Sequence, residues 1–209
     1  MKYAAYAFAK EVDHLINELT TEAFHQRIGR AKKLREELYP LSRLAVFLKL
    51  PGLSVEVEAF EDSGRADGHI HITGFRQQDF EVQLTYAGYE GADALRSELL
   101  VTQGYAPGFG KIVRKKRGGS IVAEVAAVDH DEYIHRISAA VMEKFRKKES
   151  KPYAAGTVLL IAFEDIHLFG RSAWSALFDE LAKSGGMSGS QFSQIYIFNG
   201  ATNELHRAS

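Results

Sequence analysis

Side chains that can bind metals or move protons recur at alternate positions in the segment RADGHIHITGFRQQDFEVQLT, residues 65–85. Asp67 falls on one face of a first short strand, and Glu81 and Gln83 share a face of the next, because successive side chains of a strand point to opposite faces. Two carboxylates on neighbouring strands repel each other unless a proton or a cation lies between them. The pattern therefore indicates either a water-facing sheet surface or a metal site.

Asp67 and Glu81 are the pair of carboxylates that this pattern offers to a divalent cation. Mg²⁺ is usually held by one or two carboxylates, with waters and substrate phosphates completing its shell. A bound ion of this kind polarises a phosphate and activates a water molecule. We therefore expect Mg²⁺, or Mn²⁺ in its place, as the cofactor.

His69 and His71 offer a different chemistry on the same strand. An alternating histidine pair presents both rings on one face, and with Glu81 it forms a conceivable zinc site. A small His/carboxylate metal-binding protein unrelated to nucleic acid is therefore an alternative. The metal content of the purified protein separates it from the magnesium hypothesis.

Composition places the chain among globular proteins, with 209 residues, 45% hydrophobic residues and 25% charged residues. This length suits one domain with a substantial core, so residues 1–209 are expected to form a single domain. The absence of cysteine excludes disulfides and thiolate ligands. The longest strongly apolar run, residues 158–163, is far shorter than a membrane span, and no signal peptide is evident, so we expect no membrane partner and a cytoplasmic address.

Charge is distributed unevenly although the formal net charge is only −1. Acids outnumber bases between residues 54 and 98, whereas residues 111–117 (KIVRKKR) contain no acid and residues 144–151 contain one. An acidic centre flanked by basic segments suits a metal-dependent enzyme that acts on a polyanion. Solvated surfaces are the simpler explanation of any single charge run.

The hydrophobic pattern predicts a mixed sheet flanked by helices. Helices are expected in the N-terminal third, with either a kink at Pro40 or two short helices in the segment 30–49. Alternating segments then predict an antiparallel meander of three strands. The remaining expected elements are a helix at 91–103, a hairpin within 110–127, a basic-ended helix over 130–150, and a parallel strand–helix–strand unit that ends at residue 199.

This order of elements, with Asp67 and the FEVQL stretch on successive strands, resembles the PD-(D/E)XK nuclease superfamily. The resemblance covers residues 30–199 and implies a restriction-endonuclease-like α/β fold. Residues 1–29 then form an N-terminal helical extension, and residues 110–127 form a hairpin insertion. It also implies metal-dependent hydrolysis of phosphodiester bonds in DNA, with RNA as the other substrate.

The resemblance assigns roles to particular residues. Asp67 matches the motif aspartate, Glu81 matches the second acid, and the carbonyl of Val82 becomes a further metal ligand. Gln83 stands where the motif has lysine. Glu37, or Glu36 beside it in LREEL, matches the acid on the preceding helix.

Two departures from the family pattern concern Ala66, which replaces the proline of the name, and Gln83. A glutamine amide can orient water but carries no charge to stabilise developing negative charge. Lys144, Lys147 or Lys148 on the basic helix could supply that charge or contact phosphates. The hairpin residues Lys115, Lys116 and Arg117 are further candidates for nucleic-acid binding.

The glutamine also motivates a second hypothesis, a catalytically inactive descendant of the nuclease fold that binds nucleic acid or protein. Loss of metal binding with retained, salt-sensitive DNA binding distinguishes this module from the enzyme. A homodimer is compatible with either hypothesis.

Overall fold

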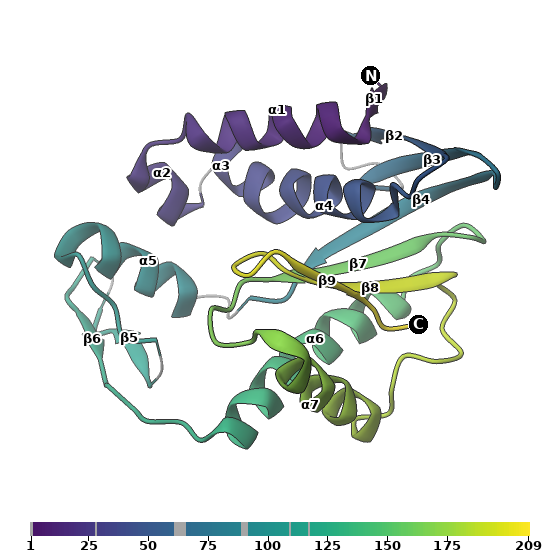
Figure 1. The fold of residues 1–209 in the computed structure, drawn as a ribbon. Coiled ribbons are helices and arrows are strands. Elements are labelled where there is room, and N and C mark those ends of the chain that lie inside the picture. The colour runs from purple at the N-terminus through teal and green to yellow at the C-terminus, as the bar shows by residue number, and fades with distance from the viewer. Residues whose placement is uncertain (1, 28, 61–65, 89–91, 109, 117) are drawn as a thin grey trace.

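The computed structural model describes residues 2–27, 29–60, 66–88, 92–108, 110–116 and 118–209. In this part of the chain one mixed sheet has helices on both faces (Figure 1). Its strands, in spatial order, are β1 (Lys2–Ala4), β2 (Leu53–Ala59), β3 (Gly68–Gly74), β4 (Gln78–Tyr86), β7 (Val158–Phe163), β8 (Gln194–Asn199) and β9 (Glu204–Arg207). The helices are α1 (Ala5–Asn17), α2 (Thr21–Gln26), α3 (Arg30–Lys33), the π-helix η1 (Leu34–Leu38), α4 (Tyr39–Leu48), α5 (Ala92–Gln103), α6 (His130–Glu149) and α7 (Gly170–Lys183).

The expected antiparallel meander is confirmed in strands β2, β3 and β4. Val57 lies opposite Ile70, and Ile70 lies opposite Phe80. Val57 and Ile70 are fully buried, whereas His69 and His71 between the apolar positions of β3 are only partly covered. The alternation read from the sequence therefore corresponds to a core face and a polar face.

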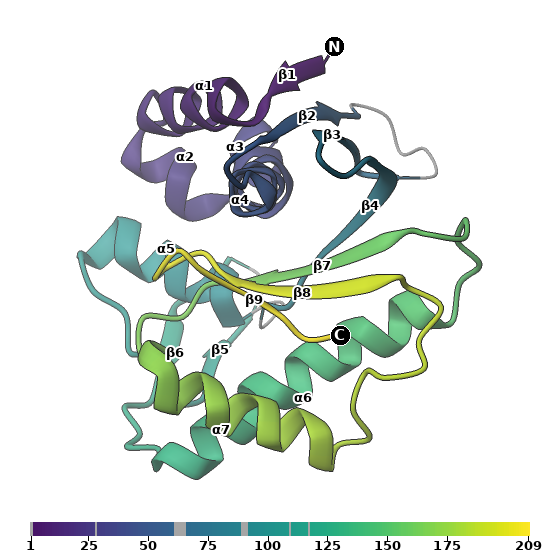
Figure 2. The same cartoon turned by 45° about the vertical axis from the view of Figure 1, so that its right-hand side comes forward.

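The expected strand–helix–strand unit is also confirmed, since β7 and β8 pair in parallel and α7 connects them. All six residues of β7 are buried, as expected for a strand covered on both faces. β4 pairs antiparallel with β3 and parallel with β7. It is thus the strand that joins the two halves of the sheet, and Figure 2 shows it passing between them.

Each face of the sheet has its own core. Leu41 and Leu44 of α4, with α1 beside them, pack on the face that carries Val57 and Ile70. On the other face Val141 of α6 and Trp174 of α7 belong to a second cluster that includes Leu159 and Ile161 of β7. Each fully buried leucine or isoleucine contributes about 1.5–3 kcal/mol. The chain is therefore a single mixed α/β domain in three layers.

Two short edge strands were not predicted. The N-terminal segment begins as strand β1, in which Tyr3 pairs with Val57, before helix α1 begins. At the other edge, His206 of β9 pairs with Ile197 of β8. Three or four residues are too few to show a hydrophobic period, so these strands depend on the sheet that they join.

The segment around Pro40, where a kink or two short helices were predicted, is irregular but has no gap. α3, η1 and α4 follow one another without a gap, and the Tyr39 N–H bonds to the Leu34 carbonyl five residues earlier. Pro40 then lies in the first turn of α4, where its missing N–H leaves no helical bond unmade. π turns of this kind are frequent at functional sites.

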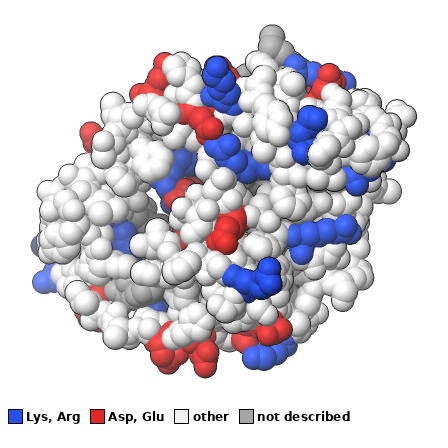
Figure 3. All heavy atoms as spheres, viewed as in Figure 1, with Lys and Arg blue, Asp and Glu red and all other residues white. Residues whose placement is uncertain are grey.

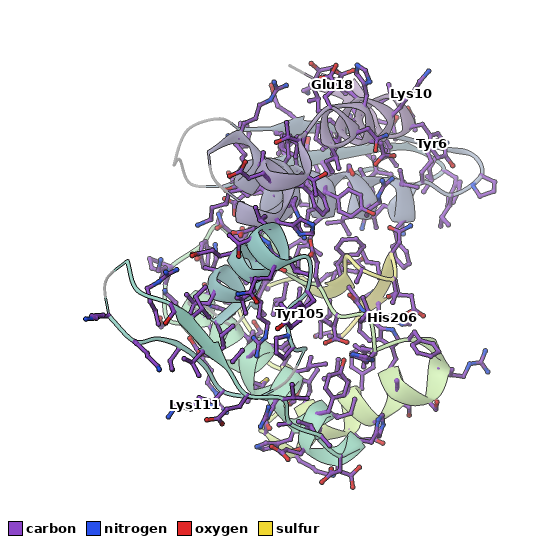
Figure 4. All side chains as sticks on the ribbon, turned by 90° about the vertical axis from the view of Figure 1, so that its left-hand side faces the viewer. Tyr6, Lys10, Glu18, Tyr105, Lys111 and His206 are labelled. Atoms are coloured by element: carbon purple, nitrogen blue, oxygen red, sulfur yellow. The ribbon has the colours of Figure 1, made fainter. Side chains whose placement is uncertain are left out.

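The predicted hairpin consists of β5 (Ile112–Arg114) and β6 (Ile121–Ala123), a separate antiparallel pair with Gly118 at a positive φ in the turn. It lies beside α5, away from the helices α1 and α4 (Figure 1). Figure 4 shows Lys111, at the start of the hairpin, on the opposite side of the molecule from Lys10 on α1. Among the described residues, no helix is long and apolar enough to cross a membrane.

Candidate functional site

A cavity of about 310 Å³ opens where strands β3 and β4 separate. β3 begins at Gly68, opposite Val82, whereas β4 continues to Tyr86 with β7 along its other edge. Helix η1 and the C-terminal end of α6 supply the rest of the wall. The residues that line the cavity are Lys32, Glu36, Glu37, Asp67, Leu84, Thr85, Tyr86, Lys144, Lys147, Lys148 and Lys151.

Asp67 lies at the point of separation. Its backbone N–H donates to the Val82 carbonyl over 3.0 Å, and its Oδ2 accepts the Leu84 N–H over 2.6 Å. The carboxylate therefore continues the hydrogen bonding of the ladder beyond the start of β3. About a third of the side chain, 34%, remains exposed, so the carboxylate faces the cavity as well as the sheet.

Lys148 reaches the same point from helix α6. Its Nζ donates to Gln83 Oε1 over 3.0 Å and lies 3.8 Å from Asp67 Oδ2. Burial lowers the pKa of Lys148, and the negative charge of Asp67 partly opposes this. A recessed ammonium group therefore lies between the buried amide of Gln83 and the carboxylate of Asp67.

Glu36 and Glu37 enter the cavity from the π-helix. Burial raises the pKa of Glu37, and the charge of Asp67 raises it further. Burial also raises the pKa of Glu36, although Lys32 lies 3.9 Å and Arg27 3.8 Å from its carboxylate. Partial burial therefore makes both carboxylates harder to ionise than free glutamate.

A buried ion pair fixes the π-helix to the end of β7. Arg35, only 8% exposed, donates to both carboxylate oxygens of Glu164, and its Nε–Oε1 distance is 3.2 Å. Arg27 also donates to Glu164 over 3.1 Å, and the Arg35 guanidinium stacks on the ring of Phe24. Glu36 and Glu37 directly follow Arg35 in the chain, so this ion pair limits where the side chains of the two glutamates can lie.

The structure brings most of the predicted site residues together. Asp67, Glu37, Lys144, Lys147 and Lys148 line one cavity. Gln83 contacts it through its hydrogen bond with Lys148. Lysine side chains from α6 and carboxylates from two other segments thus meet in one place.

Glu81 and Val82 occupy other positions. Glu81 lies opposite His69 in the ladder and is not among the described residues that line the cavity. It shares a face of β4 with Gln83 and is a diagonal neighbour of Asp67, at about 7–8 Å between Cα atoms by ordinary sheet geometry. The Val82 carbonyl accepts the Asp67 N–H, which occupies one of its two lone pairs.

Two of the basic residues predicted on the hairpin lie away from the cavity. Lys115 and Lys116 follow β5 and are not among the described residues that line it. Arg117 lies outside the described residues. The sequence analysis missed Lys32, which lies one helical turn before Glu36; this i,i+4 spacing was the available signal.

The two histidines of β3 pair with Asp79 rather than with Glu81. Nδ1 of His71 lies 3.1 Å from Asp79 Oδ2, and Nε2 of His69 contacts Oδ1 of the same carboxylate. In the part of the chain that the structure describes, no three histidine, aspartate or glutamate side chains are arranged to hold a metal ion.

The cavity carries five lysines and three carboxylates, a composition that favours an anionic ligand. The surface seen in Figure 3 is different, because basic and acidic side chains are interspersed on it. Comparisons of the chain with protein-family models, curated proteins and solved structures find no match. The functional argument therefore depends on the geometry of the site.

Proposed function

We propose that the protein is a metal-dependent nuclease with a restriction-endonuclease-like fold, which hydrolyses phosphodiester bonds in DNA or RNA. The observation that carries the proposal is the position of Lys148, with Nζ 3.0 Å from Gln83 Oε1 and 3.8 Å from Asp67 Oδ2. The nuclease motif has lysine at the position of Gln83. A lysine from α6 supplies a positive charge beside that amide.

The donor set of the cavity fits Mg²⁺ or Mn²⁺ held mainly by Asp67 and Glu37. The charge of Asp67 raises the pKa of Glu37, which is the repulsion that a shared cation relieves. Two carboxylates are too few for an all-protein cage, but Mg²⁺ keeps several waters and uses substrate phosphates. When bound, the ion polarises the phosphate and lowers the pKa of a coordinated water.

The remaining side chains have distinct roles in this proposal. Lys148 stabilises the negative charge that develops on the phosphate oxygens, an effect strengthened by its partial burial. Gln83 holds the Lys148 ammonium group in place through their hydrogen bond. Lys147 and Lys151 are exposed at the cavity and bind flanking phosphates.

A catalytically inactive nucleic-acid-binding module is the second candidate. It is favoured by the register of β3 and β4. When the register is extended by one residue, Gln83 lies opposite Asp67, and Glu81 lies two residues further along β4. The strand position closest to Asp67 therefore carries an amide rather than an acid. In this candidate the lysines bind phosphate and no cleavage follows.

The test is cleavage of DNA and RNA in the presence of Mg²⁺ or Mn²⁺ by the wild-type protein and by Asp67→Asn. The asparagine can still accept the Leu84 N–H, so the fold is retained and we expect cleavage to fall by about 10²-fold or more. Asp79→Asn is the matched control. Asp79 is an aspartate of the same sheet, but it contacts His69 and His71 outside the cavity.

Calorimetry with Mn²⁺ provides a readout that does not depend on turnover. We expect Asp67→Asn to weaken Mn²⁺ binding and Asp79→Asn to leave it unchanged. Cleavage that survives in Asp67→Asn contradicts the assignment of the site. Nucleic-acid binding without Mn²⁺ binding or cleavage establishes the second candidate instead.

A further inference from the structure

Helix α6 carries a row of side chains that extends beyond the candidate site. Arg136, Ala140, Lys144 and Lys148 follow one another at i,i+4 spacing, so they lie along one flank of the helix. Arg136 and Lys148 are separated by about 18 Å at 1.5 Å per residue. Figures 1 and 2 show α6 beneath the sheet. Helix α5 and the hairpin of β5 and β6 lie on the side of the N-terminal end of α6.

The row borders two neighbouring cavities. The second cavity, about 550 Å³, shares Lys144 with the site cavity. Its lining residues are Gly88, Ala92, His135, Arg136, Ala139, Ala140, Glu143 and Lys144. We call the two cavities together the α6 groove. Gly88, two residues after β4, and Ala92, the first residue of α5, both line the second cavity.

The lysines at the centre of the groove are recessed. The side chain of Lys144 is 8% exposed and that of Lys148 is 18% exposed, although both are long and charged. A phosphate can approach these ammonium groups only if its backbone enters the groove. A DNA duplex is stiff, with a persistence length of about 150 bp, and carries its phosphates on a convex surface that cannot follow such a recess.

The second cavity provides space beside its charged residues Arg136, Glu143 and Lys144. Gly88, Ala92, Ala139 and Ala140 have small side chains or none, and they leave room for a planar group beside the row. At the neighbouring cavity Tyr86 is half-buried, and the Arg27 guanidinium lies 4.8 Å from the centre of its ring. Aromatic rings of this kind serve as stacking platforms for unpaired bases.

We infer that the α6 groove binds single-stranded nucleic acid, with the phosphates along the row from Arg136 to Lys148 and a base in the second cavity. The identity of the polymer rests on the proposed nuclease function, whereas the preference for a single strand rests on the recessed lysines. The scissile phosphate then lies at Lys148 and Asp67, and the strand leaves past Arg136.

The experiment measures binding of fluorescent 12-nucleotide dT and rU strands, and of a 12-base-pair duplex, by anisotropy in EDTA. We expect each single strand to bind at least about tenfold more tightly than the duplex. Affinity should fall with salt, and each phosphate contact contributes about −0.7 to the slope of log K against log salt. The DNA and RNA arms show which sugar the groove accepts.

Two variants test the path of the strand. Arg136→Gln should reduce the magnitude of the salt slope by about 0.7, and Arg146→Gln, an exposed arginine of α6 that contacts Ser184 away from both cavities, should not. Ala139→Trp fills the second cavity from an exposed position and should weaken single-strand binding at least about tenfold without lowering the melting temperature.

Equal or tighter binding of the duplex overturns the inference, as does unchanged affinity in both variants or equal competition by polyglutamate. The proposed nuclease function fails separately. Single-strand binding that depends on Arg136 but leads to no metal-dependent cleavage supports the groove and refutes the enzyme. Cleavage restricted to duplex supports the enzyme and refutes the groove.

Discussion

Nζ of Lys148 lies 3.8 Å from Oδ2 of Asp67, and both residues line the cavity although they are far apart in the chain. Lys148 belongs to the last turn of α6, where the helix dipole favours a cation, and Asp67 ends the loop before β3. In the proposed function, the charge that the nuclease motif has on the strand is supplied from helix α6. This relationship can be tested by moving the charge back.

The double variant Gln83→Lys/Lys148→Gln exchanges the two groups of the 3.0 Å hydrogen bond. We expect Lys148→Gln alone to lower the cleavage rate by about 10²-fold, the usual effect of removing one electrostatic contact at a reacting group. The exchange should raise the cleavage rate at least about tenfold above that of Lys148→Gln, because the ammonium group then reaches Asp67 from β4. Initial rates on a labelled oligonucleotide measure both effects.

Gln83→Lys alone provides the control for this exchange. It places two ammonium groups beside each other in a buried position, so it should lower the melting temperature without raising the rate. A double variant that is no faster than Lys148→Gln contradicts the role of Lys148.

Two groups in the cavity determine the expected pH dependence of cleavage. The pKa of Glu37 is raised by burial and by the charge of Asp67, so Glu37 ionises at a higher pH than an ordinary glutamate, whose pKa is 4.5. The pKa of Lys148 is lowered by burial, so Lys148 loses its proton at a lower pH than an ordinary lysine as the pH rises. We expect kcat/KM to rise with pH as Glu37 ionises and to fall at higher pH as Lys148 loses its proton.

Variants assign the two limbs of this profile. Glu37→Gln should remove the rise at low pH, and Lys148→Arg should remove the fall at high pH because arginine stays protonated. Profiles measured at constant ionic strength check both changes. A profile that neither substitution alters shows that other groups control the rate.

Glu37 should also affect stability with a definite sign. Its pKa is raised in the folded state, so the folded protein binds more protons than the unfolded chain between pH 4.5 and the raised value. The contribution of Glu37 to stability therefore falls as pH rises through that window. Glu37→Gln should melt at a higher temperature than the wild type at pH 7, and the difference should vanish below pH 4.5.

Glu180→Gln is a control with the opposite sign. Hydrogen bonds from His135 and Lys183 lower the pKa of Glu180, so its charge is favoured in the folded state. Its substitution should lower the melting temperature at pH 7. Equal shifts in the two variants indicate that a general loss of negative charge, rather than burial of Glu37, determines stability.

Hydrophobic periodicity was enough to predict the central part of the fold. The alternation around Ile70 and Val82 and the apolar run from Val158 to Phe163 indicated the meander and the parallel unit. The strands β1 and β9 are too short to carry a period. The π turn before Pro40 depends on a backbone bond from Tyr39 to Leu34, which no pattern of side chains announces.

The candidate site was less accessible from sequence than the fold. Glu81 lies on a strand that the pattern predicted and Asp67 immediately precedes another, but the register places Glu81 opposite His69. A shift of two residues leaves every side chain on its predicted face, so alternation alone cannot detect it. The contact between Lys148 and Gln83 joins segments far apart in the chain, and only the packing of α6 on the sheet produces it.

The ion pair between Arg35 and Glu164 supports the π-helix, and its loss should affect stability strongly. Glu164→Gln removes the ion-pair partner of the buried Arg35 guanidinium, and we expect it to cost about 3 kcal/mol in urea denaturation. Replacing both partners, Arg35→Met/Glu164→Met, should recover at least half of that loss, because well-packed apolar side chains substitute for buried pairs. The cleavage rate of the double variant should be lower than that of the wild type, since Glu36 and Glu37 lose the contact that restricts them. Recovery of cleavage together with stability shows instead that the pair only holds the fold together.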